Sequence, residues 1–231
     1  MERPANVERG HTACVEADRS GYLHGVTQIE VWADIWCPFA HVGLRTVARR
    51  REQLGLHDVT MHVKAWPLEL VNGRPLALST TVDHMEALRR QVSAELFAGF
   101  DPDSFPRTTL PALALEAAAY DREDKVGEAV SFALRGALFE DGLDISDPGV
   151  LQDIAEAYGI RDVVPEDDQT VLAAWHEGEA RGVEGSPHFF CGDIEAFCPS
   201  LDIATGDDGD LRIRRNMAAL DEFLSECFKL D

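Results

Sequence analysis

Residues 29–45 read IEVWADIWCPFAHVGLR, a stretch that combines a strand, a cysteine and the start of a helix. Apolar side chains alternate with others over residues 29–35, which predicts a β-strand with one buried face. Pro38 suits the first turn of a helix, because the N–H that it lacks would have no intrahelical partner there. Apolar residues then recur at helical spacing until Gly55. The sequence therefore places Cys37 at a strand-to-helix junction.

The position of Cys37 favours a thiolate. The unpaired N–H groups and aligned peptide dipoles at a helix N-terminus attract negative charge. We therefore expect the pKa of this thiol to be lowered and the sulfur to be a nucleophile at neutral pH. His41, one helical turn further on, either polarises the thiolate or is an uninvolved surface histidine. Trp36 and Phe39 flank the thiol, and either form an apolar rim for a substrate or pack against the rest of the protein.

A second alternating run covers residues 59–65, so the chain opens with a β-α-β pattern. Residues 182–190, GVEGSPHFF, lie much later, where a helical pattern ends in glycines and a serine–proline bond leads into a short apolar strand. Gly192-Asp193 then separates two short apolar runs, which is typical of a two-residue hairpin turn. The predicted sheet is mixed, with two parallel strands from the first half and an antiparallel hairpin from the second.

The chain between these segments has a helical pattern interrupted by turns. The predicted helices cover residues 82–97, 110–120, 125–140, 149–158 and 167–181, and a closing helix covers 217–228. Asp147 and Pro148 are typical of a capped helix start. Residues 202–215 show little pattern and are predicted to form a loop.

Together, the two segments resemble the thioredoxin superfamily, and more closely its DsbA-like branch. That branch carries a Cys-Pro-x-x start to its first helix, a helical insertion, and a Val-x-Gly-x-Pro segment with a cis proline. Cys37-Pro38-Phe39-Ala40 matches the first motif and residues 183–187 match the last. The resemblance implies an α/β fold, with a thioredoxin-like mixed sheet and a large all-helical insertion. The implied parts are a thioredoxin-like domain at 26–80 and 182–231 and the insertion at 81–181. Residues 1–25 are polar and show no periodicity, which predicts a flexible tail.

The motif departs from the family pattern at Ala40, where the second cysteine of Cys-x-x-Cys would stand. In a dithiol enzyme that second cysteine releases the mixed disulfide made by the first. The resemblance therefore implies a thiol–disulfide oxidoreductase that acts through Cys37 alone, with an external thiol resolving the mixed disulfide. Kappa-class glutathione transferases and 2-hydroxychromene-2-carboxylate isomerases replace motif cysteines by serine and bind glutathione on the same fold. A transferase or isomerase of that type is the alternative, and a scaffold without chemistry is a third reading.

The resemblance also implies substrate-binding roles. These roles fall on Trp36, Pro38 and Phe39 beside the thiol, and on the Ser186 backbone, which a cis Pro187 would present for strand-like pairing with a substrate. No cofactor is expected, apart from glutathione or another low-molecular-weight thiol as co-substrate.

Two further residues are auxiliary candidates. The His188 side chain points either into the sheet or towards the cleft. If Gly192-Asp193 forms the hairpin turn, Cys198 lies opposite Pro187, next to the expected position of the nucleophile. We therefore hypothesise that Cys198 substitutes for the missing resolving thiol, the alternative being that it is a small buried apolar residue.

The composition of the chain limits the classes of partner that we expect it to bind. The net charge of −21 argues against nucleic acid and anionic membranes, because both would repel the protein. The sequence has no apolar run of about 20 residues, and its first 25 residues lack the apolar core of a signal peptide. Five cysteines, an odd number, do not suggest a disulfide framework. We therefore expect a cytoplasmic protein whose partners are protein or small-molecule thiols and disulfides, and a monomer and a homodimer are both compatible.

Zinc is not favoured by the sequence. His188, Cys191 and Cys198 lack the Cys-x2–4-Cys spacing of structural zinc sites. We therefore predict no metal ligands.

Overall fold

The computed structural model describes residues 28–74, 77–161 and 169–230, so the predicted tail at 1–25 lies outside the described residues. The strands are β1 (Gln28–Ala33), β2 (Thr60–Ala65), β3 (His188–Cys191), β4 (Ile194–Phe197), β5 (Leu201–Thr205) and β6 (Leu211–Arg215). The helices are α1 (Pro38–Gln53), α2 (Leu68–Val71), α3 (Leu78–Gln91), α4 (Leu110–Tyr120), α5 (Asp124–Phe139), α6 (Pro148–Ala157), α7 (Gln169–Arg181) and α8 (Met217–Phe228), with a short 3-10 turn at Pro102–Ser104.

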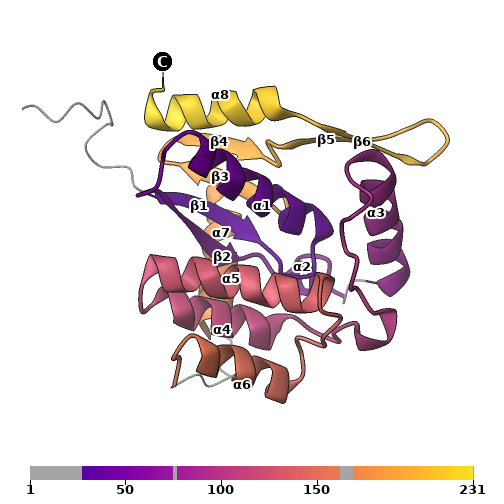
Figure 1. Ribbon diagram of the computed structural model, residues 1–231, viewed down its shortest axis with the longest axis vertical. Coiled ribbons are helices and arrows are strands. Elements are labelled where there is room, and N and C mark those ends of the chain that lie inside the picture. Colours follow the sequence, from indigo (N-terminus) through magenta and orange to yellow (C-terminus); the bar gives the residue numbers. More distant parts are fainter. Residues whose placement is uncertain (1–27, 75–76, 162–168, 231) are drawn as a thin grey trace, which may run out of the picture.

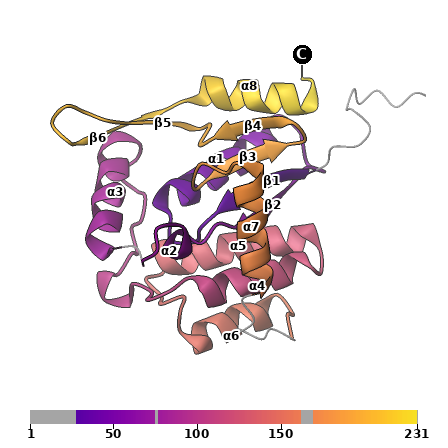
Figure 2. The same ribbon diagram turned by 180° about the vertical axis from the view of Figure 1, so that it is seen from behind.

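The central sheet has four strands in the order β2-β1-β3-β4. β1 and β2 run parallel, whereas β3 is antiparallel to both β1 and β4. This arrangement confirms the predicted mixed sheet, and the pairing of Cys191 with Ile194 confirms the predicted hairpin turn. Figure 1 shows α1 and α8 on one side of the sheet, and Figure 2, seen from behind, shows α7 on the other.

Alternation along the strands builds a core on each face. Odd-numbered residues of β1 and β3, among them Val31 and Phe189, pack with apolar residues of α1 and α8. The opposite face carries Trp32 and Phe190, whose rings meet edge to face at 5.2 Å. α7 approaches this face closely because Gly178 has no side chain: a Cβ there would lie 2.7 Å from the Trp32 ring. The sheet is thus covered on both sides, as expected for an α/β fold.

The helical region between β2 and β3 is assembled around α4 and α5, which lie below the sheet in Figure 1. A fully buried ion pair joins the two helices, since Arg135 Nη1 lies 2.6 Å from Glu116 Oε1. Asp147 caps α6 as predicted, because its carboxylate accepts the backbone N–H groups of Gly149 and Val150. α3 starts and ends earlier than the sequence pattern suggests, and the short helix α2 was not predicted. Within the described residues, no helix has both the length and the apolar character needed to cross a membrane.

The prediction of a loop over residues 202–215 is wrong. β5 and β6 form a second, two-stranded antiparallel sheet in which Ile203 pairs with Ile213. Apolar residues do alternate with charged ones in both strands, but each run is short and the polar residues 206–210 separate the two. The Gln91 side chain of α3 binds this hairpin, because its amide donates to the Leu211 carbonyl at 2.8 Å and accepts the Ile213 N–H at 2.9 Å. Figures 1 and 2 both show the hairpin reaching out to α3.

Candidate functional site

Cys37 is the N-cap residue of α1. Its backbone is extended, with φ −80° and ψ 112°, and its carbonyl accepts the first helical hydrogen bond from the His41 N–H at 3.1 Å. Pro38 occupies the first helical position, as the sequence predicts. The Cys37 side chain is 4% exposed, so the sulfur lies at the helix start beneath the surface.

The late proline segment lies against this sulfur. The Ser186-Pro187 peptide bond is cis, as expected, and the Cys37 thiol donates to the Ser186 carbonyl at 3.1 Å. The Ser186 hydroxyl accepts the Asp34 N–H at 2.9 Å. Residues 149 positions apart in the sequence therefore share one site.

α1 can approach Pro187 because Gly43 lies on the facing side of the helix. A Cβ at Gly43 would lie 3.3 Å from Pro187 Cγ and 3.8 Å from Ser200 Oγ. The first of these distances is tighter than an ordinary van der Waals contact, so any side chain at this position would push on the proline segment.

The expectation of a lowered Cys37 pKa is not met, because the pKa of this thiol is raised. Burial is the largest cause, since a charged sulfur loses its hydration there. The Ser186 side chain and the N–H groups of Ala40 and Phe39 do lower the pKa, as the helix-start argument requires. These contributions are outweighed by burial and by the Asp34 carboxylate. Burial in this structure thus favours the protonated form of the Cys37 thiol.

Asp34 is a part of the site that sequence reasoning missed. It is fully buried, and its carboxylate accepts the N–H groups of Leu68 at 2.6 Å and Trp36 at 3.4 Å. Burial raises its pKa to about 7, although these hydrogen bonds lower it. An acidic residue three positions before the cysteine, within an otherwise apolar stretch, was the signal that could have identified it.

The two aromatic candidates have different surroundings. Trp36 is fully buried and stacks on Phe105 with ring centroids 5.7 Å apart, which matches packing against the insertion rather than a substrate rim. Phe39 is partly exposed and lies beside His84 of α3, with ring centroids 5.0 Å apart. Phe39 is therefore the one of the two with a surface that a substrate can contact.

His41 is buried and its side chain contacts the helical insertion. Its Nε2 lies 2.8 Å from Glu140 at the end of α5, and its ring packs on Phe97 and Phe139. Burial lowers its pKa more than Glu140 raises it. His41 thus links α1 to the insertion, and the surface position that the sequence suggested for it is wrong.

The two remaining candidates flank Pro187. His188 is buried on the sheet, where Phe190 lies 4.4 Å from its ring and its Nδ1 accepts the Glu184 N–H at 3.2 Å. Its side chain thus points into the sheet, which is the first of the two expected directions. The Cys198 N–H donates to the Pro187 carbonyl at 3.0 Å, which confirms the predicted position opposite the proline.

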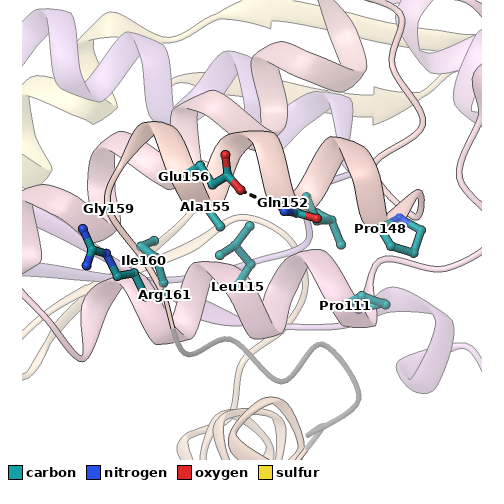
Figure 3. Close-up of a pocket in the computed structure, with 10 residues that line it drawn as sticks. Pro111, Leu115, Pro148, Gln152, Ala155, Glu156, Gly159, Ile160 and Arg161 are labelled. Carbon is teal, nitrogen blue, oxygen red and sulfur yellow. Dashed lines mark hydrogen bonds between the residues drawn. The ribbon is translucent and has the colours of Figure 1, made fainter.

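A separate pocket of about 650 Å³ lies between α4 and α6 (Figure 3). Leu115, Ala155 and Ile160 line it, together with Gln152, which donates to Glu156 at 2.8 Å. None of the candidate residues around Cys37 lines this pocket, so it does not belong to the thiol site. The described ranges hold no group of three His, Cys, Asp or Glu side chains that could bind a metal ion.

A cysteine at the start of the first helix, in contact with a cis serine–proline segment at one end of a four-stranded mixed sheet, defines a thioredoxin-like protein. The chain belongs to the DSBA-like thioredoxin domain family, which matches residues 28–206. No curated protein matches the sequence.

Solved structures show the same fold. A protein disulfide isomerase candidate from Nitrosomonas europaea is 17% identical with a TM-score of 0.58, and the match covers 86% of this chain and 96% of that one. 2-Hydroxychromene-2-carboxylate isomerase is 16% identical with a TM-score of 0.51, over 74% and 88% of the two chains. The cytosolic disulfide reductase DsbM from Pseudomonas aeruginosa, solved with GSH, is 14% identical with a TM-score of 0.51, over 86% and 96%. At sequence identities this low, the similarity shows a shared fold and nothing about activity.

Proposed function

We propose that this member of the DsbA-like family is a thiol–disulfide oxidoreductase whose nucleophile is Cys37. The observation that carries the proposal is the 3.1 Å contact between the Cys37 sulfur and the Ser186 carbonyl at the first turn of α1. A sulfur in that position can attack a disulfide held along the Ser186 backbone. Pro38, Phe39 and Pro187 complete the substrate-binding surface.

The reaction begins when the Cys37 thiolate attacks a disulfide and expels one half of it as a thiol. The other half stays on Cys37 as a mixed disulfide. Ala40 has no sulfur to release it, so a second thiol from solution, such as glutathione, supplies the electrons that complete the cycle.

The raised pKa of Cys37 affects both the attack on a disulfide and the release of the mixed disulfide. Only the thiolate attacks, so the rate of attack should increase with pH through the alkaline range. A thiol with a high pKa is the stronger nucleophile once it is ionised, but it leaves a mixed disulfide slowly. We infer that the site favours reduction of disulfides over their donation to other proteins.

The proposed partners are thiols and disulfides of small molecules or proteins. A reductase described as cytosolic, DsbM, was solved with GSH on the same fold, which agrees with a cytoplasmic location and glutathione as co-substrate here. The net charge of −21 disfavours nucleic acids and anionic membranes as partners. A homodimer remains a prediction.

The test is reduction of cystine and of 2-hydroxyethyl disulfide by the full-length protein, with reduced glutathione as the electron donor for both. C37S should lose all activity above background. C191S is the matched control, because Cys191 is equally buried but lies on β3 away from the Ser186 contact, and it should retain activity. Equal activity of C37S and the natural protein would contradict the proposal.

The second candidate is a kappa-type transferase or isomerase that binds glutathione or another small thiol. It is favoured by Ala40, since a site without the second motif cysteine can hold a thiol cofactor without exchanging disulfides. Saturable glutathione binding measured by calorimetry, without turnover of either disulfide, would select this candidate.

A further inference from the structure

Two cysteines contact the same pair of consecutive residues. The Cys37 sulfur lies 3.1 Å from the Ser186 carbonyl, and the Cys198 N–H lies 3.0 Å from the Pro187 carbonyl. The β3–β4 register fixes the second contact, because His188 pairs with Phe197 and the next residue outward on each strand is Pro187 or Cys198. The fold therefore brings residues 37 and 198 to the same short segment.

α1 also lies against the chain that follows Cys198. The position of a Cβ at Gly43 is only 3.8 Å from Ser200 Oγ, two residues after Cys198. The two sulfurs interact electrostatically as well: burial and the charge of Cys37 together raise the pKa of Cys198 to about 12. Cys198 thus lies within electrostatic range of the nucleophile, on the side of α1 that faces the proline segment.

The backbone at Cys198 is unusual for its residue type. Its φ is +46°, in the left-handed region that glycine and asparagine occupy with least cost. Such a residue persists where its surroundings fix it, and such positions cluster at functional sites. Cys198 is also 3% exposed, so its sulfur is held inside the protein.

The other described cysteines do not offer the same arrangement. The side chains of Cys191 and Cys227 interact with each other, between β3 and α8. Their partners on the same face, Phe189 and Phe223, lie 6.2 Å apart between ring centroids, so this pair belongs to the packing of α8 on the sheet. Among the described cysteines, Cys198 is the one whose backbone bonds to Pro187, the neighbour of the Ser186 carbonyl that Cys37 contacts.

We propose that Cys198 is an internal resolving thiol for Cys37, taking the role that a cysteine at position 40 would have. This inference rests on the proposed function and alters one of its steps. After Cys37 has formed a mixed disulfide, the Cys198 sulfur attacks the Cys37 sulfur. A Cys37–Cys198 bond forms, the bond to the substrate breaks, and the substrate half leaves as a thiol that takes up the Cys198 proton.

Electrons and protons balance over the cycle. The substrate disulfide gains two electrons and two protons and becomes two thiols, while Cys37 and Cys198 are oxidised to a disulfide. Two molecules of a low-molecular-weight thiol such as glutathione then reduce that disulfide and are themselves oxidised to glutathione disulfide. The external thiol of the proposed function thus acts after the substrate has been released.

Burial is the largest cause of the high Cys198 pKa, and it persists after Cys37 has formed a mixed disulfide. The step is favoured instead by proximity, which an internal thiol has over a thiol that must arrive from solution.

The experiment uses the reduced full-length protein and oxidised glutathione as the probe. The reaction is quenched with acid, free thiols are alkylated, and digested peptides are identified by mass spectrometry. The natural protein should yield a linked Cys37–Cys198 peptide pair. C198S should instead accumulate glutathione on Cys37. The lifetime of this adduct should be about tenfold longer or more than in the natural protein, which is a small part of the rate advantage that proximity can give.

Two variants control this result. C191S removes an equally buried cysteine and should still give the linked pair. C37S should leave Cys198 without glutathione, because Cys198 acts only on a Cys37 adduct. If C198S does not fold, as judged by circular dichroism, C198A replaces it, and the peptide map of the natural protein decides the question without any variant.

The outcomes separate the two proposals. Persistent glutathione on Cys37 of the natural protein, without a link to Cys198, overturns the internal resolving thiol but leaves Cys37 as the nucleophile. A link from Cys37 to a different cysteine also overturns it. Absence of both the adduct and the link shows that Cys37 does not attack disulfides, and the proposed function then fails together with the inference.

Discussion

At the residue scale, opposing effects act on the Cys37 sulfur. The N–H groups at the start of α1 and the Ser186 side chain favour the thiolate, while burial and the Asp34 carboxylate favour the thiol. Burial and the Asp34 carboxylate have the larger effect, so the pKa of Cys37 is raised. Sequence analysis identified the first pair from Pro38 and the strand–helix junction, but burial of a side chain depends on segments far away in the chain.

Asp34 provides a test of this balance. In D34N the negative charge that opposes the thiolate is absent, so the Cys37 pKa should fall and the pH profile of alkylation should move to lower pH. At about pH 8 the rate of reaction of Cys37 with iodoacetamide should increase roughly tenfold, the effect of a charge interaction of about 1.4 kcal/mol. The measurement is the alkylation rate of the Cys37 peptide against pH, by mass spectrometry.

The control for D34N is D58N, which removes the same charge from an exposed position after α1. Its Cys37 alkylation profile should match that of the natural protein. A slower reaction in D34N, with the fold retained, would mean that the Asp34 carboxylate assists the thiol instead of opposing it.

The candidate site could be predicted only in part from the sequence. Cys37 and Pro38 follow from local patterns, and the position of Cys198 follows from counting along a hairpin. The cis bond before Pro187 follows from the family resemblance. Asp34 was not identified, because strand alternation assigns it to an outward face when its carboxylate is in fact enclosed by the turn towards α2. His41 was misplaced for a related reason, since the insertion covers that side of α1.

At the element scale, the approach of α1 to the proline segment depends on Gly43. G43A would gain helix propensity but place a Cβ 3.3 Å from Pro187 Cγ. We expect a net loss of about 1 kcal/mol in the free energy of unfolding, because the strain of overpacking exceeds the gain. We also expect slower alkylation of Cys37. Urea unfolding and the alkylation rate measure the two effects.

Gly136 in α5 is the matched control for Gly43. It is also a helical glycine, but no heavy atom lies within 4 Å of its Cβ position. G136A should therefore stabilise the protein by about 0.5–1 kcal/mol and leave Cys37 unchanged. If G43A stabilised the protein to the same extent, α1 and the proline segment would not be in close contact.

Helices and strands could be predicted where the apolar residues of a segment follow one spacing, either helical or alternating. α8 has the predicted bounds, and the parallel and antiparallel pairs of the mixed sheet follow from the β-α-β opening and the hairpin turn. β5 and β6 were missed because their alternating runs are short and a polar stretch separates them. The bond between β6 and Gln91 of α3 joins residues far apart in the sequence, so no local pattern could predict it.

At the scale of the whole molecule, the net charge of −21 produces self-repulsion in the folded state. Salt screens this repulsion, so the melting temperature at neutral pH should rise by several degrees between about 50 mM and about 1 M salt. Scanning calorimetry measures the effect, and NaCl and KCl should act alike if screening is the cause. A melting temperature that is unchanged or falls with salt would show that attractive ion pairs outweigh the repulsion.

The side-chain amide of Gln91 donates and accepts as a backbone peptide does, so it stands in for one residue of a third strand beside β6. An uncovered strand edge is a template on which other chains can pair and aggregate. By occupying the Leu211 carbonyl and the Ile213 N–H, one glutamine blocks strand addition at the middle of that edge. Gln91 thereby protects the β5–β6 hairpin against self-association through the edge of β6.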